Sequence, residues 1–144
     1  MISTELEVSL HLAFVEARQQ RHEKLTVEHM LLALLDNPSA QKVLKVCHAD
    51  IESLRLSLIT FMKEHLKSVD GEKEVDVLPT HSLQRVIQRA IMTVETRNTG
   101  AEVTGADMLL SITGEREYSY AMLCIQQLVT KNMFEAAMCE PSLP

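Results

Sequence analysis

The sequence predicts an all-α fold of eight helices, arranged as two similar copies of a four-helix unit. The main observation is an internal repeat, because the stretch Leu25–Leu34 (LTVEHMLLAL) returns as Val103–Ile112 (VTGADMLLSI). The match extends upstream to three pairs of apolar positions: Leu6 and Leu83, Leu10 and Ile87, Ala13 and Ala90. A duplicated segment indicates a fold built from two copies of one packing arrangement, with the shared positions in the core.

Composition also favours helices. Hydrophobic residues make up 46% of the 144 residues and aromatic residues only 3%, so the core must be aliphatic. Four glycines and four prolines give few turn signals, which favours a few long helices over many short strands. The length suits one domain with a proper core.

Charge and cysteine content restrict the environment and the partners. The net charge of -6 lacks the basic excess that phosphate binding requires, so nucleic acid is not an expected partner. Cys47, Cys124 and Cys139 are odd in number and show no CxxC spacing, which indicates a reducing compartment. No apolar run approaches the roughly 18 residues of a membrane span, and the first residues do not resemble a signal peptide. We therefore expect a cytoplasmic protein without membrane contact.

The first copy is expected to hold four helices. The first runs from about Thr4 to Gln20, since its apolar residues recur every three or four positions. Thr26 can cap the second, Val27 to about Leu35, which is apolar nearly all round and therefore central. Pro38 suits the first turn of a third helix, and Asp50 can cap a longer amphipathic fourth helix.

The second copy repeats this plan. One helix is expected from about Ser82 to Arg97. A short buried helix begins at Thr104, where Asp107 completes an approximate capping box. The last two helices are expected over about Glu115 to Gln127 and from about Thr130 onward.

These elements define the predicted domain organisation. We expect a single domain over residues 1–144, with the two repeats at 1–66 and 80–139. Residues 67–79 are charged, contain a glycine and lack helical periodicity, so we interpret them as a mobile linker. Residues 140–144 are expected to be a frayed tail.

The sequence offers no catalytic motif. It contains no GxxxxGK[ST], GxSxG or HExxH pattern, so a nucleotide site of the P-loop kind is absent. Cys47 and His48 are adjacent, but neighbours on a helix point about 100° apart, which does not suit a nucleophile and its base.

A group of histidines and glutamates precedes and begins the second helix. His22, Glu23, Glu28 and His29 could form an exposed acidic surface that contacts a partner protein. The helix macrodipole alone also accounts for Glu28 in the first turn. Imidazole and carboxylate ligate zinc, so His22, Glu28 and His29 are incidental metal candidates. No metal is expected, because the ordered spacing of a three- or four-ligand site is missing.

The two copies differ at this helix start. Glu28 and His29 are replaced by Ala106 and Asp107 in the second copy, which suggests that only the first copy carries the contact. An unselected solvated surface would show the same difference.

Several stretches resemble the N-terminal domains of the ClpA-type ATP-dependent unfoldases of bacteria. These are Glu5–Leu10, Ala13–Phe14, Ala17–Arg18, Arg21–Glu23, Leu25–Leu35, Asn37–Ala40, Leu83–Ala90 and Glu102–Ala106. The resemblance covers nearly the whole chain and is weakest over Lys67–Leu78 and after Met138.

The resemblance implies a Clp repeat domain, a non-enzymatic double four-helix module tethered to ATPase rings outside this chain. It implies docking of the ClpS adaptor, which brings N-degron substrates, and delivery of unfolded proteins to the ClpP peptidase. The adaptor surface would include Glu23, Glu28 and Thr80, while Arg85 and Lys131 are weaker candidates for a substrate or inter-domain surface. ATP and Mg would act in the ATPase modules, so no cofactor is expected here. The isolated domain is expected to be a monomer.

Two other interpretations remain open. One is a stand-alone helical module that binds peptides, which an ATPase sequence encoded after residue 144 would argue against. The other is a small metal-dependent enzyme that uses His22, Glu28 and His29, which zinc titration with an activity screen would test.

Overall fold

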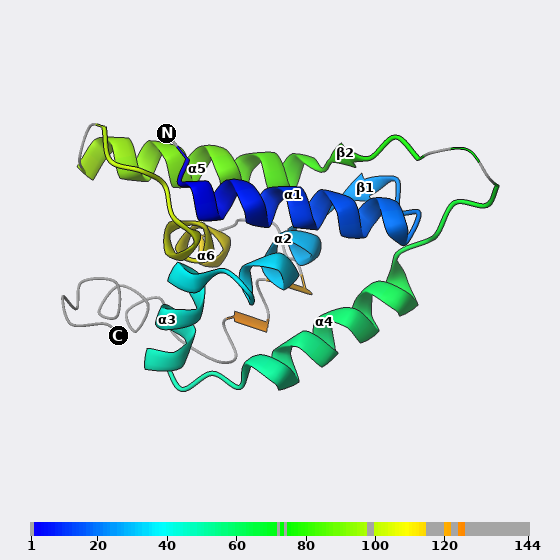
Figure 1. Ribbon diagram of the computed structural model, residues 1–144, viewed down its shortest axis with the longest axis horizontal. Helices are drawn as coiled ribbons and strands as arrows, with labels where there is room; N and C mark the ends of the chain where they lie inside the picture. The colour runs from blue at the N-terminus through cyan, green and yellow to red at the C-terminus, as the bar shows by residue number, and fades with distance from the viewer. Residues whose placement is uncertain are drawn as a thin grey trace.

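The computed structural model describes residues 2–71, 73, 75–97, 100–114, 120, 121, 124 and 125. In chain order its elements are α1 (Thr4–Gln19), β1 (Lys24–Leu25), α2 (Val27–Leu34), α3 (Pro38–Val46), α4 (Ile51–His65), β2 (Leu78–Pro79), α5 (His81–Arg97) and α6 (Gly105–Thr113) (Figure 1). The all-α class is confirmed. The last two predicted helices, Glu115 to Gln127 and from Thr130 onward, lie almost entirely outside the described residues. Within the described ranges no helix is long and apolar enough to cross a membrane.

Side-chain caps begin the helices where the sequence predicts them. Thr26 Oγ1 and Asp50 Oδ1 accept backbone N–H groups from the first turns of α2 and α4, at 3.3 and 3.0 Å. At α6, Asp107 Oδ2 accepts the Thr104 N–H at 2.9 Å while Thr104 Oγ1 accepts the Asp107 N–H. The predicted capping box is therefore confirmed. These bonds satisfy N–H groups that the first turn of a helix leaves unpaired.

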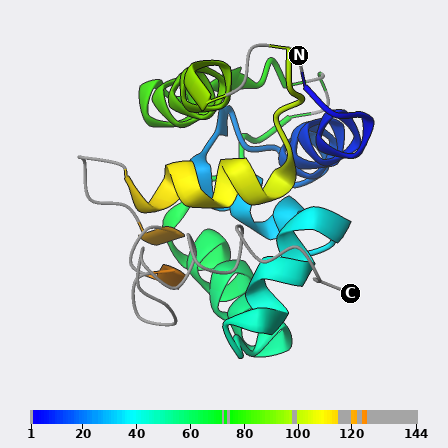
Figure 2. The same ribbon diagram turned by 90° about the vertical axis from the view of Figure 1, so that its left-hand side faces the viewer.

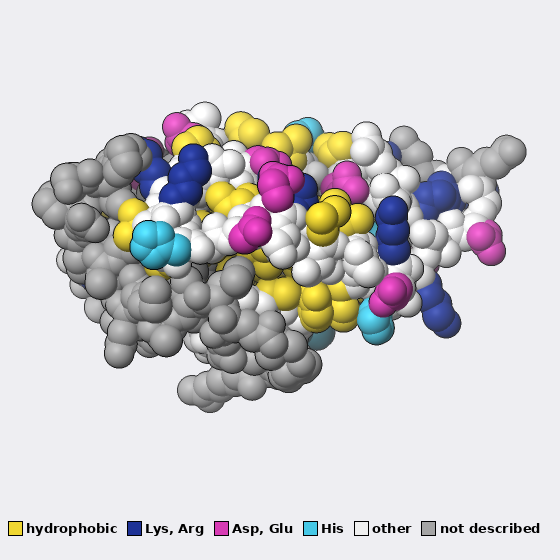
Figure 3. All heavy atoms as spheres, turned by 90° about the horizontal axis from the view of Figure 1, so that it is seen from below, with side chains coloured by type: hydrophobic (Ala, Val, Ile, Leu, Met, Phe, Trp, Pro, Cys, Tyr) yellow, Lys and Arg dark blue, Asp and Glu magenta, His cyan; other side chains and the backbone are white. Residues whose placement is uncertain are grey.

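The helices are arranged as two related pairs in contact. α1 and α5 lie along the top of Figure 1, with α2 and α6 below them and α3 and α4 lowest. α1 packs on α2 and α5 packs on α6, as expected for two copies of one unit. α2 touches both α5 and α6, and α3 packs on α6, which crosses the middle of the molecule in Figure 2. On the face seen from below (Figure 3), hydrophobic side chains reach the surface among charged ones.

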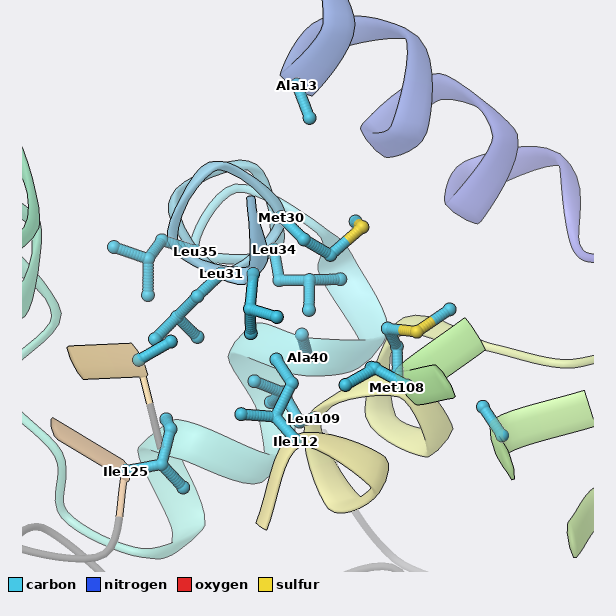
Figure 4. Close-up of a cluster of buried hydrophobic side chains, with 14 of the residues drawn as sticks. Ala13, Met30, Leu31, Leu34, Leu35, Ala40, Met108, Leu109, Ile112 and Ile125 are labelled. Carbon is cyan, nitrogen blue, oxygen red and sulfur yellow. The ribbon is translucent and has the colours of Figure 1, made fainter. Parts of the chain in front are cut away.

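Most of the positions that the two copies share are in the core, as predicted, while Leu10 and Ile87 are partly buried against it. Met30, Leu31, Met108, Leu109 and Ile112 are all 0% exposed. Figure 4 shows these side chains of α2 and α6 gathered in one cluster. Full burial of each such side chain contributes about 1.5–3 kcal/mol to the stability of the fold. The core therefore lies where the two copies meet.

Short β pairings also join the two copies, and the sequence did not indicate them. β1 pairs with β2 in parallel. Ile2 pairs with Val103 in the same orientation, and the Ser3 N–H donates to the Val103 carbonyl at 2.9 Å. In both cases the segment that enters the first helix of one copy pairs with the segment that enters the second helix of the other copy.

The segment interpreted as a linker, residues 67–79, contacts the first copy near both of its ends. The Val69 N–H donates to the Arg21 carbonyl at 2.8 Å, and the last two residues form β2. Val77, just before β2, is buried. The start of the segment is thus anchored on the turn between α1 and β1, and its end is anchored mainly on β1. The domain boundaries at 67 and 79 stay a prediction.

Candidate functional site

The exposed side of the β1–β2 pair is the candidate functional site. In this pair Lys24 lies opposite Leu78. The Leu78 N–H donates to the Glu23 carbonyl and the Thr80 N–H donates to the Leu25 carbonyl, both at 3.0 Å. The two bonds place Glu23 close to Thr80, although α2, α3 and α4 separate these residues along the chain.

We refer to residues 23–24 and 78–80 as the ledge. Its side chains are exposed except that of Thr80, which is half-buried. Thr80 Oγ1 accepts the Leu83 N–H at 3.1 Å and so caps α5. Leu78 is 69% exposed and places an apolar group on the ledge. Sequence reasoning missed Leu78, whose only signal is an apolar residue between a charged segment and a helix.

A clamped turn holds Glu23 in position. Arg21 has φ 56°, in the left-handed region that costs an ordinary residue about 1–2 kcal/mol. Arg21 Nε donates to the Val69 carbonyl at 2.6 Å, and the Arg21 carbonyl accepts the Val69 N–H at 2.8 Å. A surface hollow of 680 Å³ adjoins this turn and is lined by Arg21, Glu23, Asp70 and Asp76, among others. Glu23 therefore shares the lining of this hollow with both acidic and basic side chains.

Behind the ledge, His22 and His29 are buried and hydrogen-bonded to each other. His22 Nδ1 and His29 Nε2 are 2.9 Å apart, with the rings edge to face. The Thr26 N–H donates to His29 Nδ1 at 3.0 Å, so this nitrogen carries no proton. In the neutral ring the proton is then on His29 Nε2, which donates it to His22 Nδ1.

This geometry explains one difference between the repeats. In α2 the His29 imidazole accepts the Thr26 N–H, and in α6 the Asp107 carboxylate accepts the Thr104 N–H. Asp107 also forms an ion pair with Arg97, with Oδ1 and Nη2 2.9 Å apart. His29 and Asp107 are both buried. At this position the copies therefore differ in how they cap a helix, not in an exposed contact.

Burial makes both imidazoles weak bases. Burial, followed by repulsion from His22, lowers the pKa of His29 from 6.5 to about 4. Burial also lowers the pKa of His22, against the opposing effect of the Glu16 carboxylate. The pair is therefore uncharged at neutral pH.

Glu28 lies inside the protein. It is 8% exposed, and its Oε2 accepts the Ala121 N–H at 2.8 Å. Burial raises the pKa of Glu28, while hydrogen bonds from the backbone and from Thr26 act in the opposite direction. The expectation that Glu28 lies on an exposed acidic surface is therefore wrong. Its carboxylate instead satisfies a buried backbone N–H from a distant part of the chain.

Glu28→Ala is expected to lower the free energy of unfolding by about 1–3 kcal/mol, because it leaves the buried Ala121 N–H without an acceptor. Glu28→Gln keeps a carbonyl oxygen at this position and should lose less stability. Urea denaturation of both variants measures the difference. An alanine variant as stable as the wild type would show that this bond has no structural role.

His22, Glu28 and His29 are not arranged as a metal site. The facing nitrogens of the two histidines are occupied by their mutual hydrogen bond, and the Glu28 carboxylate binds the backbone of Ala121. Among the residues that the structure describes, no group of three or more histidine, cysteine, aspartate and glutamate side chains could hold a metal ion. The geometry gives no support to the metal-enzyme interpretation.

Arg85 lies on α5, five residues after Thr80 of the ledge. Its Nη2 donates to Ser82 Oγ at 3.0 Å. It lines a surface hollow of 640 Å³ together with Arg89 and Met92, among others, and Met92 is 67% exposed. Lys131 lies outside the described residues. The suggested roles of Arg85 and Lys131 stay predictions.

Solved structures share this fold. The N-domain of ClpV from Vibrio cholerae matches with a TM-score of 0.71 at 20% identity, covering 99% of this chain and 88% of that chain. A complex of the ClpV N-domain with a VipB peptide matches with a TM-score of 0.71 at 18% identity, covering 99% and 90%. At these identities the similarity concerns the fold alone.

Sequence comparison identifies the family. A ClpA homolog protein of Fuscovulum blasticum is 41% identical over 133 residues, which are 90% of this chain. The chain spans 16% of the length of that relative. Residues 1–126 match the model of the Clp repeat (R) N-terminal domain. With the duplicated helical fold and a family match over most of its length, the chain belongs to the Clp repeat N-terminal domain family.

Proposed function

We propose that this chain is the adaptor- and substrate-docking domain of a ClpA-type ATPase, and that a ClpS-type adaptor binds at the ledge. One observation carries the proposal: the β1–β2 pairing brings the exposed Glu23 and the half-buried Thr80 close together. The ATPase modules would lie in the remainder of a longer protein, since the ClpA homolog is much longer than this chain.

The domain would act by binding and positioning. A tethered docking domain raises the effective concentration of its partner near the unfolding machinery. The adaptor would bring N-degron substrates, and unfolded chains would pass through the ring to a ClpP-type peptidase. No cofactor would be needed for docking, because ATP and Mg would act in the ATPase modules. The complex of a ClpV N-domain with a VipB peptide supports a protein or peptide partner for this fold.

The ledge has the chemistry of a protein contact. Glu23 offers a carboxylate, and the exposed Leu78 offers an apolar group next to it. An adaptor would place a basic side chain against Glu23 and an apolar side chain against Leu78. Glu28 is not part of this contact, because its carboxylate is buried against Ala121.

Glu23→Lys is expected to weaken adaptor binding by about tenfold or more, since it reverses the charge at the edge of the contact. The fold should be unaffected, because Glu23 takes part in the β1–β2 pairing through its backbone carbonyl. Calorimetric titration with a ClpS-type adaptor measures the affinity. Glu95→Lys is the matched control, because it makes the same change at an exposed site near the other end of α5.

A second variant tests Thr80 without removing the cap of α5. In Thr80→Asn the new side chain can still accept the Leu83 N–H, so weaker adaptor binding would reflect the contact and not a damaged helix. Unchanged binding by Glu23→Lys would rule out the ledge as the adaptor surface. No binding by the wild-type protein would rule out the adaptor role itself.

A further inference from the structure

α1 carries hydrophobic side chains on its outer face as well as on its inner face. The inner face is formed by the buried residues Leu6, Ser9, Ala13 and Ala17. On the other side, Val8 and Leu12 are 52% and 49% exposed, and Val15 is partly exposed. Spacings of four and three residues align these three side chains along the helix. We refer to Val8, Leu12 and Val15 as the outer stripe.

Val8 and Leu12 lie outside the buried face of α1. α1 contacts α2 and β1, and its buried positions all belong to the inner face. A surface helix normally carries polar residues on the opposite side. A single exposed leucine is common, as with Leu56 on α4, which is 65% exposed. Three apolar side chains aligned on one side of a helix are more typical of a contact surface.

Acidic side chains border the outer stripe. Glu5 lies three residues before Val8 and Glu16 lies four residues after Leu12, so both carboxylates lie along the same side of it. The helix macrodipole explains Glu5 in the first turn of α1, but it disfavours Glu16 in the last turn. Glu16 Oε1 accepts a hydrogen bond from Gln20 Nε2 at 3.4 Å, and its carboxylate acts on the pKa of His22. Glu5 and Glu16 together still make this side of the outer stripe acidic, which a basic partner would complement.

We propose that the outer stripe docks an amphipathic, basic helix of a partner protein. The partner would lay its apolar side chains on Val8, Leu12 and Val15. Its lysine or arginine side chains would lie along the side that carries Glu5 and Glu16, which are roughly 16 Å apart along the helix axis. A second copy of this chain fits poorly, because antiparallel pairing would bring Glu5 of one copy near Glu16 of the other. The same carboxylates would repel an anionic membrane.

α1 is already held in place for such a contact. Ser3 Oγ accepts the Leu6 N–H at 3.2 Å and the Ser3 N–H donates to the Val103 carbonyl at 2.9 Å, which fixes the start of the helix. A preformed helix loses little conformational entropy on binding. The outer stripe is separate from the ledge, which begins at Glu23 beyond the end of α1. The proposed partner is therefore additional to the adaptor.

The full chain can be titrated with a labelled synthetic peptide of about 18 residues, which has leucines at helical spacing and lysines along one flank. Fluorescence anisotropy should show binding, and Val8→Gln combined with Leu12→Gln should weaken it by about tenfold or more. Leu56→Gln removes an exposed leucine elsewhere and should bind as the wild type does. Glu5→Gln with Glu16→Gln should weaken binding and reduce its dependence on salt.

Several results would overturn the proposal. The peptide could bind the glutamine double variant as tightly as the wild type, or a peptide with glutamates in place of the lysines could bind equally well. Self-association that Leu12→Gln abolishes in sedimentation would identify a second copy as the occupant. Binding to phosphatidylserine vesicles that Leu12→Gln abolishes would identify a membrane. If the Val8→Gln and Leu12→Gln variant were less stable than the wild type, the Glu5→Gln and Glu16→Gln variant would still test the proposal, because it leaves the outer stripe intact.

Discussion

Gly105→Ala is expected to lower the free energy of unfolding by more than about 3 kcal/mol and the melting temperature by about 10 °C. A Cβ at Gly105 would overlap the side-chain oxygen of Asn37 and lie 2.5 Å from its Cγ. Asn37 is 1% exposed, and its Nδ2 donates to Ser9 Oγ at 3.0 Å while its Oδ1 accepts the Ala40 N–H at 3.1 Å. Relief of the overlap would break these buried bonds. Thermal and urea denaturation measure the loss.

Gly114→Ala is the matched control. A Cβ there would meet no atom closer than 3.6 Å, and the φ of -92° is open to alanine, so stability should stay near that of the wild type. Asn37→Ala removes the side chain that would clash with the new Cβ in Gly105→Ala. The double variant should therefore lose less stability than the sum of the two single losses. Additive losses would show that the two positions do not clash.

The same contact shows which parts of the fold could be predicted from the sequence. Met30 and Met108 are equivalent in the repeat and both are buried, because helical periodicity reports directly on the inner face of a helix. Caps are also local signals. Val27 and Gly105 begin equivalent helices, and Gly105 lies directly against the Asn37 side chain. The periodicity of a segment does not reveal which distant side chain lies against it.

The candidate site could be predicted only in part. Glu23 and Thr80 were named, but the two-residue strands that join them are too short to show any periodicity. Glu28 was misplaced because its partner is a backbone N–H far along the chain. The capping role of His29 was missed because glutamate or glutamine usually completes a capping box. The exposure of Leu78 follows from the strand pairing and was missed with it.

Acidification from pH 6.5 to pH 4 is expected to remove about 3 kcal/mol of stability through His29. Burial and the neighbouring His22 lower the pKa of His29 from 6.5 to about 4, so the folded protein binds this proton less readily than the unfolded chain. Above pH 6.5 neither state holds the proton, and the full stability is present. Below pH 6.5 the unfolded chain binds it first, so stability falls until about pH 4. The Thr26 N–H already donates to the nitrogen that would have to be protonated.

Two neighbouring groups change how steeply the stability falls with decreasing pH. Burial lowers the pKa of His22, so His22 adds to the destabilisation by acid. Burial raises the pKa of Glu28, so the folded protein binds the Glu28 proton before the unfolded chain does. Glu28 therefore stabilises the fold as the pH falls, and it opposes the histidines. The pH dependence of the wild-type stability combines the effects of His29, His22 and Glu28. A variant is therefore needed to isolate the effect of His29.

His29→Gln separates them, because a glutamine carbonyl can accept the Thr26 N–H and keep the capping box but cannot titrate. At pH 7 the variant should be about 1 kcal/mol less stable than the wild type, since it loses the bond to His22. Glu28 is unchanged in both proteins, so its contribution cancels in the difference. Urea denaturation between pH 7 and pH 4 should therefore show two curves that cross, with the variant more stable in acid. Parallel curves would mean that His29 is not an acid-sensitive group of this fold.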